Sequence, residues 1–168
     1  MPNMLDVLQI LTSQHSEVDA LIEQLETGKG DQAATFIRLA DQLAAHAAVE
    51  EKIFYPAVMM KETSDLLHES VEEHLEIKRV LADMLALDPR EDEDEFKAKL
   101  SVLKENLSHH AHEEEEAKMF PQLRKLLSAD ERAALGNDVL ALFESLIQRE
   151  PRLHVPEETA AAAPLPSA

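Results

Sequence analysis

Two short stretches of the chain place histidine one helical turn ahead of glutamate and then end in an aromatic residue and proline. The first reads HAAVEEKIFYP at residues 46–56, and the second reads HHAHEEEEAKMFP at residues 109–121. On a helix, residues four positions apart lie on nearly the same face, one turn from each other. A histidine and a glutamate at this spacing can therefore direct a nitrogen and an oxygen ligand to one metal site.

The apolar pattern predicts that several such side chains face the protein core. In four segments, apolar residues recur in steps of three and four, and polar residues that can bind metal interrupt these stripes. The inward-facing residues are His15, His46, Glu50, His74, His110 and Glu114. Every one of the four segments thus contributes at least one inward histidine.

Burying these groups requires a compensating charge, because an isolated buried carboxylate costs several kcal/mol. Two metal ions would supply it, with Glu50 and Glu114 able to bridge both ions. Histidines with carboxylates suit iron better than magnesium or calcium, which prefer oxygen ligands. The chain has no cysteine, which argues against thiolate zinc and iron–sulfur sites. The sequence predicts two carboxylate-bridged non-haem iron ions, with manganese or a mixed-metal pair as alternatives.

The ligands in the second stretch have open alternatives. Three overlapping histidine–glutamate pairs of equal spacing occur within residues 109–116, and only continuity with the leucine stripe favours the middle pair. When the two stretches are aligned on their closing prolines, Glu115 instead of Glu114 matches Glu50, and a small helical irregularity would reconcile the two choices. The less favoured ligands are Glu51, His109, His112 and Glu115.

The elements that must position these residues are long helices. We expect them at about residues 4–26, 31–60, 63–86 and 93–126. Ser128 and Glu131 form a capping-box pattern that begins a fifth helix, which runs to about residue 149. The short connections favour antiparallel neighbours. The expected fold is all-α, an up-down-up-down four-helix bundle with an additional C-terminal helix.

Length and composition agree with one acidic helical domain. The 168 residues fit a single domain, expected over residues 1–150, while residues 151–168 are rich in Pro and Ala and are expected to be disordered. The formal net charge of −18 repels nucleic acid and anionic membranes. The sequence shows no signal-peptide pattern and no apolar stretch that could span a membrane, so a cytoplasmic protein is expected.

With these residues in view, the chain resembles the hemerythrin-like, or HHE cation-binding, family. The family pattern of histidine, HxxxE, histidine and HxxxE on successive helices is similar to His15, HAAVE at 46–50, His74 and HAHEE at 110–114. The phrases QHSEVDALIEQL, EEHLEIKRVL and LSADERAALG are also similar to bacterial members, so the resemblance covers about residues 5–149. It implies an antiparallel four-helix bundle with a non-haem di-iron centre.

The chain also departs from the oxygen-carrying hemerythrins proper. Those proteins place a second histidine one turn after the first on the third helix, where this chain has Lys78, and their last pair commonly uses aspartate at a longer spacing. Lys78 would leave one iron short of a nitrogen ligand or extend to the bundle's edge. Tyr55 is expected in the core, with a hydrogen bond to a ligand as the alternative. His68 and His154 are expected on the surface.

Three functions are compatible with these residues. The first is a di-iron protein that binds dioxygen or a related ligand such as nitric oxide, or that senses iron or redox state in a stress response. The second is a di-iron enzyme that removes hydrogen peroxide or another reactive species. The third is a metal-free helical interaction module, in which the histidines are ordinary polar residues. The coincidence of inward histidines on four helices favours the metal-binding functions.

Overall fold

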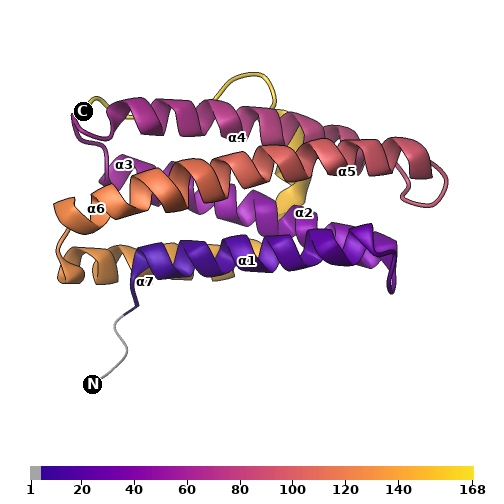
Figure 1. The fold of residues 1–168 in the computed structure, drawn as a ribbon, viewed down its shortest axis with the longest axis horizontal. Helices are drawn as coiled ribbons and strands as arrows, with labels where there is room; N and C mark the ends of the chain where they lie inside the picture. The colour runs from indigo at the N-terminus through magenta and orange to yellow at the C-terminus, as the bar shows by residue number, and fades with distance from the viewer. Residues whose placement is uncertain (1–4) are drawn as a thin grey trace.

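The protein is a bundle of antiparallel helices (Figure 1), seen in a computed structural model that describes residues 5–168. The bundle helices are α1 (Val7–Glu26), α2 (Gln32–Val49), α4 (Ser64–Leu85) and α5 (Glu93–Leu107), followed by α7 (Ala129–Ile147). These elements confirm the expected all-α bundle with an additional helix. The expected start of the first helix at residue 4 lies outside the described residues. Among the described helices, none is both long and apolar enough to cross a membrane.

Polar side chains set the starts of three helices. Asp6 and Asp31 accept hydrogen bonds from the free backbone N–H groups at the starts of α1 and α2. At the start of α7, Ser128 and Glu131 form the predicted capping box, with each side chain accepting from the other residue's backbone N–H. Gly28 adopts a φ of 67° in the turn between α1 and α2, where a side chain would be strained.

Two of the long helices contain π-helical segments that the apolar pattern did not predict. η1 (Glu50–Phe54) continues α2 and is followed by α3 (Tyr55–Ala57), whereas η2 (Ser108–Met119) continues α5 and is followed by α6 (Phe120–Leu126). The prolines at 56 and 121 lie just after these segments. A proline within a helix crowds the carbonyl four residues earlier, and a wider π-turn ahead of it relieves that contact.

The core consists of two apolar clusters with a polar layer between them. One cluster includes Val18, Leu43, Ile77 and Leu107. The other includes Leu11, Val49, Val71 and Met119. Within each cluster, these four residues come from four different helical runs, and in each run a buried histidine lies between the two clusters. Apolar packing on both sides therefore fixes the depth at which the polar side chains meet.

The helix α7 covers α1 and α2 at close range, and its closest approach is at Gly136. A Cβ atom on this residue would lie 2.9 Å from the backbone oxygen of Leu5 and 3.2 Å from the backbone nitrogen of Val7. Only glycine lets the two backbones approach this closely.

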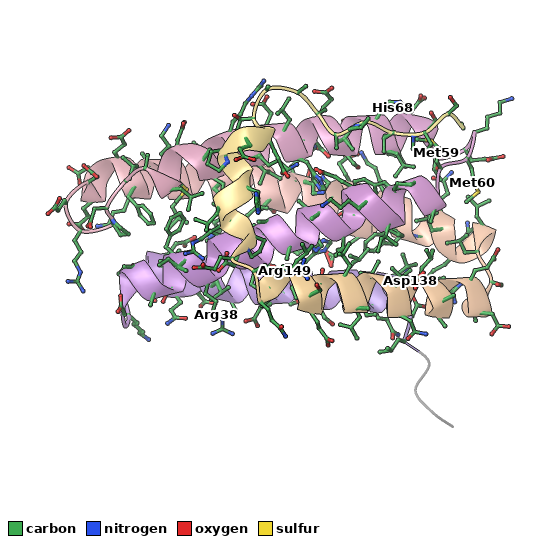
Figure 2. The ribbon with its side chains drawn as sticks, turned by 180° about the vertical axis from the view of Figure 1, so that it is seen from behind. Arg38, Met59, Met60, His68, Asp138 and Arg149 are labelled. Carbon is green, nitrogen blue, oxygen red and sulfur yellow. The ribbon has the colours of Figure 1, made fainter. Side chains whose placement is uncertain are left out.

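The C-terminal residues differ from the expected disorder. Pro151–Glu158 form a 3-10 helix, η3, that crosses α2 and α4, and the following residues run along α4 past His68 (Figure 2). Val155 is 2% exposed within the apolar core, and the guanidinium of Arg152 lies 2.9 Å from Asp41 Oδ2. The segment lacks a helical apolar period because one apolar anchor and a few polar contacts, instead of a continuous stripe, hold it to the bundle.

Candidate metal centre

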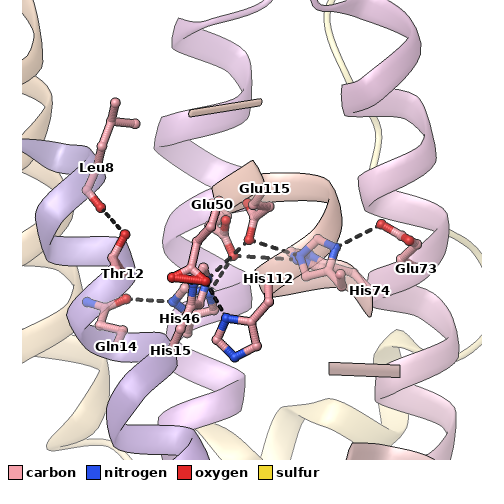
Figure 3. A network of polar contacts seen from close by, with 12 residues as sticks. Leu8, Thr12, Gln14, His15, His46, Glu50, Glu73, His74, His112 and Glu115 are labelled. Atoms are coloured by element: carbon pink, nitrogen blue, oxygen red, sulfur yellow. Dashed lines mark hydrogen bonds and ion pairs between the residues drawn. The ribbon is translucent and has the colours of Figure 1, made fainter. Parts of the chain in front are cut away.

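Two groups of buried side chains in the polar layer could each hold a metal ion. Within each group, the candidate ligand atoms lie within 4.8 Å of one another. The first group contains His15, His46 and Glu115, and the second contains Glu50, His74 and His110. No residue in either group is more than 6% exposed. The labelled members converge from α1, α2, η1, α4 and η2 in Figure 3.

The two carboxylates connect the groups. Glu50 Oε1 lies 2.7 Å from Nε2 of His46, in the first group, and 3.5 Å from Nε2 of His74, in the second. Glu115 Oε1 lies 3.2 Å from Nε2 of the α1 histidine and 3.3 Å from Nε2 of the buried η2 histidine. Each carboxylate therefore contacts one histidine of each group, which is the arrangement that a pair of bridged ions requires.

Several of these buried atoms have no hydrogen-bond partner in the protein. They are both ring nitrogens of His15, Nε2 of His46, both oxygens of Glu50 and Oε1 of Glu115. Buried polar groups are almost always hydrogen-bonded, and each exception costs about 1–3 kcal/mol or more. Metal ions among these nitrogens and anionic oxygens would satisfy them together. The donor set thus fits a pair of cations.

Outer hydrogen bonds orient three of the histidines. Nδ1 of His46 lies 2.6 Å from Gln14 Oε1, Nδ1 of His74 lies 3.0 Å from Glu51 Oε1, and Nδ1 of His110 lies 2.9 Å from Glu73 Oε1. We assign the ring proton to Nδ1, which then donates to the outer oxygen. Nε2 keeps a lone pair directed at the centre, as in most histidine-ligated metal sites.

The carboxylates of the centre stabilise positive charge on the groups around them. Burial would lower the pKa of His110, but the charge of the nearby Glu115 and a hydrogen bond to Glu73 raise it well above its usual value. Burial would likewise raise the pKa of Glu50, but the charge of His46 and close contacts with that histidine and His74 hold it well below its usual value. The carboxylates therefore hold positive charge at the centre, either as protons on the imidazoles or as metal ions.

Tyr55 completes the buried network. Its hydroxyl donates to Glu115 Oε2 at 3.1 Å and lies 3.2 Å from Nε2 of His74 and 3.4 Å from Nε2 of His110. Burial is the main cause that raises the pKa of Tyr55 well above its usual value, and the negative charges of Glu115 and Glu50 raise it further. The tyrosine therefore keeps its proton and fixes the orientation of one bridging carboxylate. The core position is as predicted, and the hydrogen bond is the alternative that the sequence left open.

The structure differs from the favoured ligand choice in η2. Glu115 points into the centre, whereas the buried Glu114 turns to Lys118, with Oε1 2.5 Å from Nζ. The π-helical backbone is the reason, because it places the inward carboxylate five residues after His110 instead of four. The other five favoured residues lie in the two groups where the pattern placed them.

The remaining candidates lie around the centre. Glu51 binds His74 and Lys78 from outside, with Oε1 2.8 Å from the lysine Nζ. The side chains of His109 and His112 are 48% and 39% exposed and pair with surface carboxylates. Lys78 is itself buried, 7% exposed, and its Nζ also pairs with Glu158 at 3.0 Å.

Comparison with known proteins agrees with this geometry. Residues 6–123 match the hemerythrin HHE cation-binding domain. The chain belongs to the hemerythrin HHE cation-binding family. This HHE chain is 25% identical over 147 residues to a protein of Nostoc sp. (strain PCC 7120 / SAG 25.82 / UTEX 2576) named DNA nickase. The alignment covers 86% of this chain and 41% of that protein, so the chain spans about two fifths of its relative's length. No solved structure matches the chain.

The family match also places the two groups in context. All four histidines and both glutamates of the two groups lie within the matched residues, whereas α7 and η3 lie beyond them. The buried His/Glu groups of this HHE domain therefore indicate metal binding. Helix α7 and η3 are additions that cover the bundle.

Proposed function

We propose that this chain is a non-haem di-iron protein that binds dioxygen or a related diatomic ligand such as nitric oxide. The observation that carries this proposal is the pair of carboxylates, Glu50 and Glu115, each in contact with one histidine of either group. With four imidazoles and two shared carboxylates, each ion would keep open positions for a small ligand. When bound there, a diferrous pair would supply the two electrons that reduce dioxygen to the peroxide level.

The space beside the centre supports a ligand of very small size. A cavity of about 20 Å³ lies against His15, His46 and His110, and its other walls include Leu43 and Leu107. This volume holds about one water-sized molecule, since a single water requires about 10–15 Å³ measured in this way. The lining combines apolar side chains with three imidazoles and Asp19, so its small volume restricts the ligand to a molecule of a few atoms.

In this centre, outer residues of the protein orient the candidate ligands, and apolar residues exclude water. The outer oxygens of Gln14, Glu51 and Glu73 hold three imidazole rings in place. Tyr55 holds one carboxylate, and the two apolar clusters shield the layer from solvent on both sides. Sensing of iron or redox state would follow from the same arrangement, because loss of the ions leaves buried charges without partners and loosens the bundle.

Peroxide removal is the second candidate function. It uses the same ligands, and Tyr55 supplies a hydroxyl next to three of them. The nickase name of the Nostoc relative supports no DNA-cutting function here. The chain covers only 41% of that protein, and its net charge of −18 opposes approach to a phosphate backbone.

Metal content and absorption test this function directly. The full chain is produced in iron-supplemented cells, and iron is counted per chain before and after reduction and return to air. We expect about two irons per chain, with ferric absorption that bleaches on reduction and returns in air. A folded, stable chain without metal would refute the proposal and support the interaction module.

Two further measurements distinguish the remaining alternatives. Rapid hydrogen peroxide turnover by the iron-loaded chain, without reversible ligand binding, would support the enzyme. His46→Ala is expected to lose at least one ion, whereas His154→Ala is the matched control because that exposed residue lies away from the centre. Full iron content in the His46 variant would contradict the ligand assignment.

A further inference from the structure

We propose that Lys78 is a positioning residue of the metal centre: through Glu51, its ammonium limits how strongly His74 binds oxidised iron. The lysine is buried and follows the histidine by one turn on α4. Its Nζ lies 2.8 Å from Glu51 Oε1 and 2.9 Å from Oε2. The same Oε1 lies 3.0 Å from Nδ1 of His74. One carboxylate oxygen therefore contacts both the ammonium and the ring of a candidate ligand.

The hydrogen bond from an imidazole to an outer carboxylate controls how well the ring binds metal. The carboxylate draws the Nδ1 proton toward itself, which raises the electron density at Nε2 and makes the ring a stronger ligand. An ammonium on the same oxygen balances part of its negative charge, so the oxygen attracts the ring proton less. Fe³⁺ gains more than Fe²⁺ from a stronger donor, because its charge is higher. Lys78 therefore favours the reduced state of the ion that His74 binds, an inference that rests on the proposed iron pair.

This arrangement distinguishes the two groups of the centre. In the first group, the outer partner of His46 is the neutral amide of Gln14. In the second group, the outer partner of His110 is Glu73, whose other oxygen lies 2.8 Å from an exposed imidazole. Among the outer partners that the structure describes, only Glu51 lies against an ammonium. The fixed charge therefore acts on the second group more than on the first.

A carboxylate from the C-terminal segment shares this ammonium. Glu158, the last residue of η3, places its Oε2 3.0 Å from Lys78 Nζ. Its side chain is 46% exposed, whereas that of Glu51 is 9% exposed, so solvent screens the charge of Glu158 more strongly. Glu158 thus offsets part of the charge of the lysine and leaves less of it for Glu51. Because η3 lies beyond residues 6–123, this adjustment comes from a segment outside the matched HHE domain.

The reduction potential of the iron-loaded full chain tests this role, because a charge effect has a sign that loss of packing does not predict. Lys78→Met removes the ammonium from a side chain of similar length, and Lys78→Arg keeps the positive charge. At one applied potential, Lys78→Met is expected to raise the ratio of oxidised to reduced iron about tenfold, while Lys78→Arg stays close to the parent. Glu158→Gln removes the competing carboxylate and is expected to lower the ratio by a smaller factor. Lys104→Met is the matched control, since it removes an exposed ammonium that pairs with Glu26.

The signs and the control decide the outcome. An unchanged ratio in Lys78→Met, or an equal rise in Lys104→Met, would overturn the proposal. A rise in both Lys78→Met and Glu158→Gln would also overturn it, because a structural defect and not a charge would then be the cause. If Lys78→Met does not fold, Glu158→Gln decides alone: a lowered ratio supports the charge effect, and an unchanged or raised ratio overturns it.

The Zn²⁺-loaded full chain provides a second readout, because zinc has no redox step. The Nδ1 proton of His74 is followed by nuclear magnetic resonance and is expected to move downfield in Lys78→Met, since its hydrogen bond to Glu51 becomes stronger. An unmoved resonance would overturn the proposal. A parent chain that held Zn²⁺ but no iron, with the expected downfield shift in the variant, would refute the iron pair and leave the effect of Lys78 on His74 standing. A chain that held neither ion would refute both.

Discussion

Replacement of Glu115 by glutamine tests the assignment of the bridging carboxylates most directly. The side chain is fully buried and contacts Tyr55 and a histidine from each group. Loss of a residue that only orients a ligand typically weakens metal binding about 10–100-fold. Loss of a bridging oxygen should therefore cost at least about 100-fold, or about 2.7 kcal/mol at about 1.36 kcal/mol per tenfold.

The metal-free chain should respond differently to the same substitution. Glu50 and Glu115 are both fully buried against the same two groups of histidines, so two carboxylates share one buried region. Glutamine at position 115 removes one of these two negative charges. The neighbouring imidazoles are then less strongly stabilised in their protonated form and can lose a proton. We expect the stability of the metal-free chain to change by less than about 1 kcal/mol, or to increase.

The assay compares thermal unfolding with and without a chelator. For a domain of this size, 1 kcal/mol shifts Tm by about 2–4 °C, so Glu115→Gln should remove about 5–10 °C of the metal-dependent stabilisation. Glu114→Gln is the control, because that carboxylate turns away from the centre and pairs with the exposed Lys118. Metal loss in the Glu114 variant alone would show that the reasoning about the π-helical register is wrong.

Three further substitutions test the surrounding structure. Tyr55→Phe should keep both ions but weaken binding about 10–100-fold in a chelator competition, because Glu115 loses its hydrogen-bond donor; unchanged affinity would remove the tyrosine from the site. Val155→Ala should cost about 1–3 kcal/mol in chemical denaturation, since the side chain is 2% exposed; no loss would mean that η3 contributes no packing. Gly136→Ala should cost about 1–3 kcal/mol by overpacking against Leu5, despite its better helix propensity; a more stable variant would contradict the close approach of α1 and α7.

The fold could be predicted because its signals are local and repeated. Apolar residues in steps of three and four mark every long helix, and the Ser128–Glu131 pattern specifies a helix start through two hydrogen bonds. Residues 151–158 lack both kinds of signal. Their order comes from contacts distant in sequence, such as Arg152 with Asp41, which no periodicity reveals.

The site was predictable where the backbone is regular. His15 and His74 lie in uninterrupted α-helix, so the apolar stripe identified their inward faces correctly. His46 and Glu50 were also placed correctly, because η1 begins only at the glutamate. The stripe failed after His110, where the π-helical segment shifts every later side chain relative to α-helical spacing.

The repeated aromatic–proline ending explains why the alignment on proline succeeds where the stripe fails. In both stretches, the aromatic residue before proline donates its backbone N–H to the carbonyl of the inward glutamate five residues earlier, Tyr55 to Glu50 and Phe120 to Glu115. Each aromatic ring then packs against a histidine of the centre, with ring centroids 5.5 Å apart for Tyr55 and His74 and 6.2 Å apart for Phe120 and His15. The proline favours the π-helical turn that precedes it, because a regular α-helical turn would crowd its ring. That turn directs both the glutamate and the aromatic ring toward the buried histidines. The spacing that repeats within the chain is therefore the one from glutamate to proline, and it identifies the inward carboxylates better than the distance from histidine to glutamate.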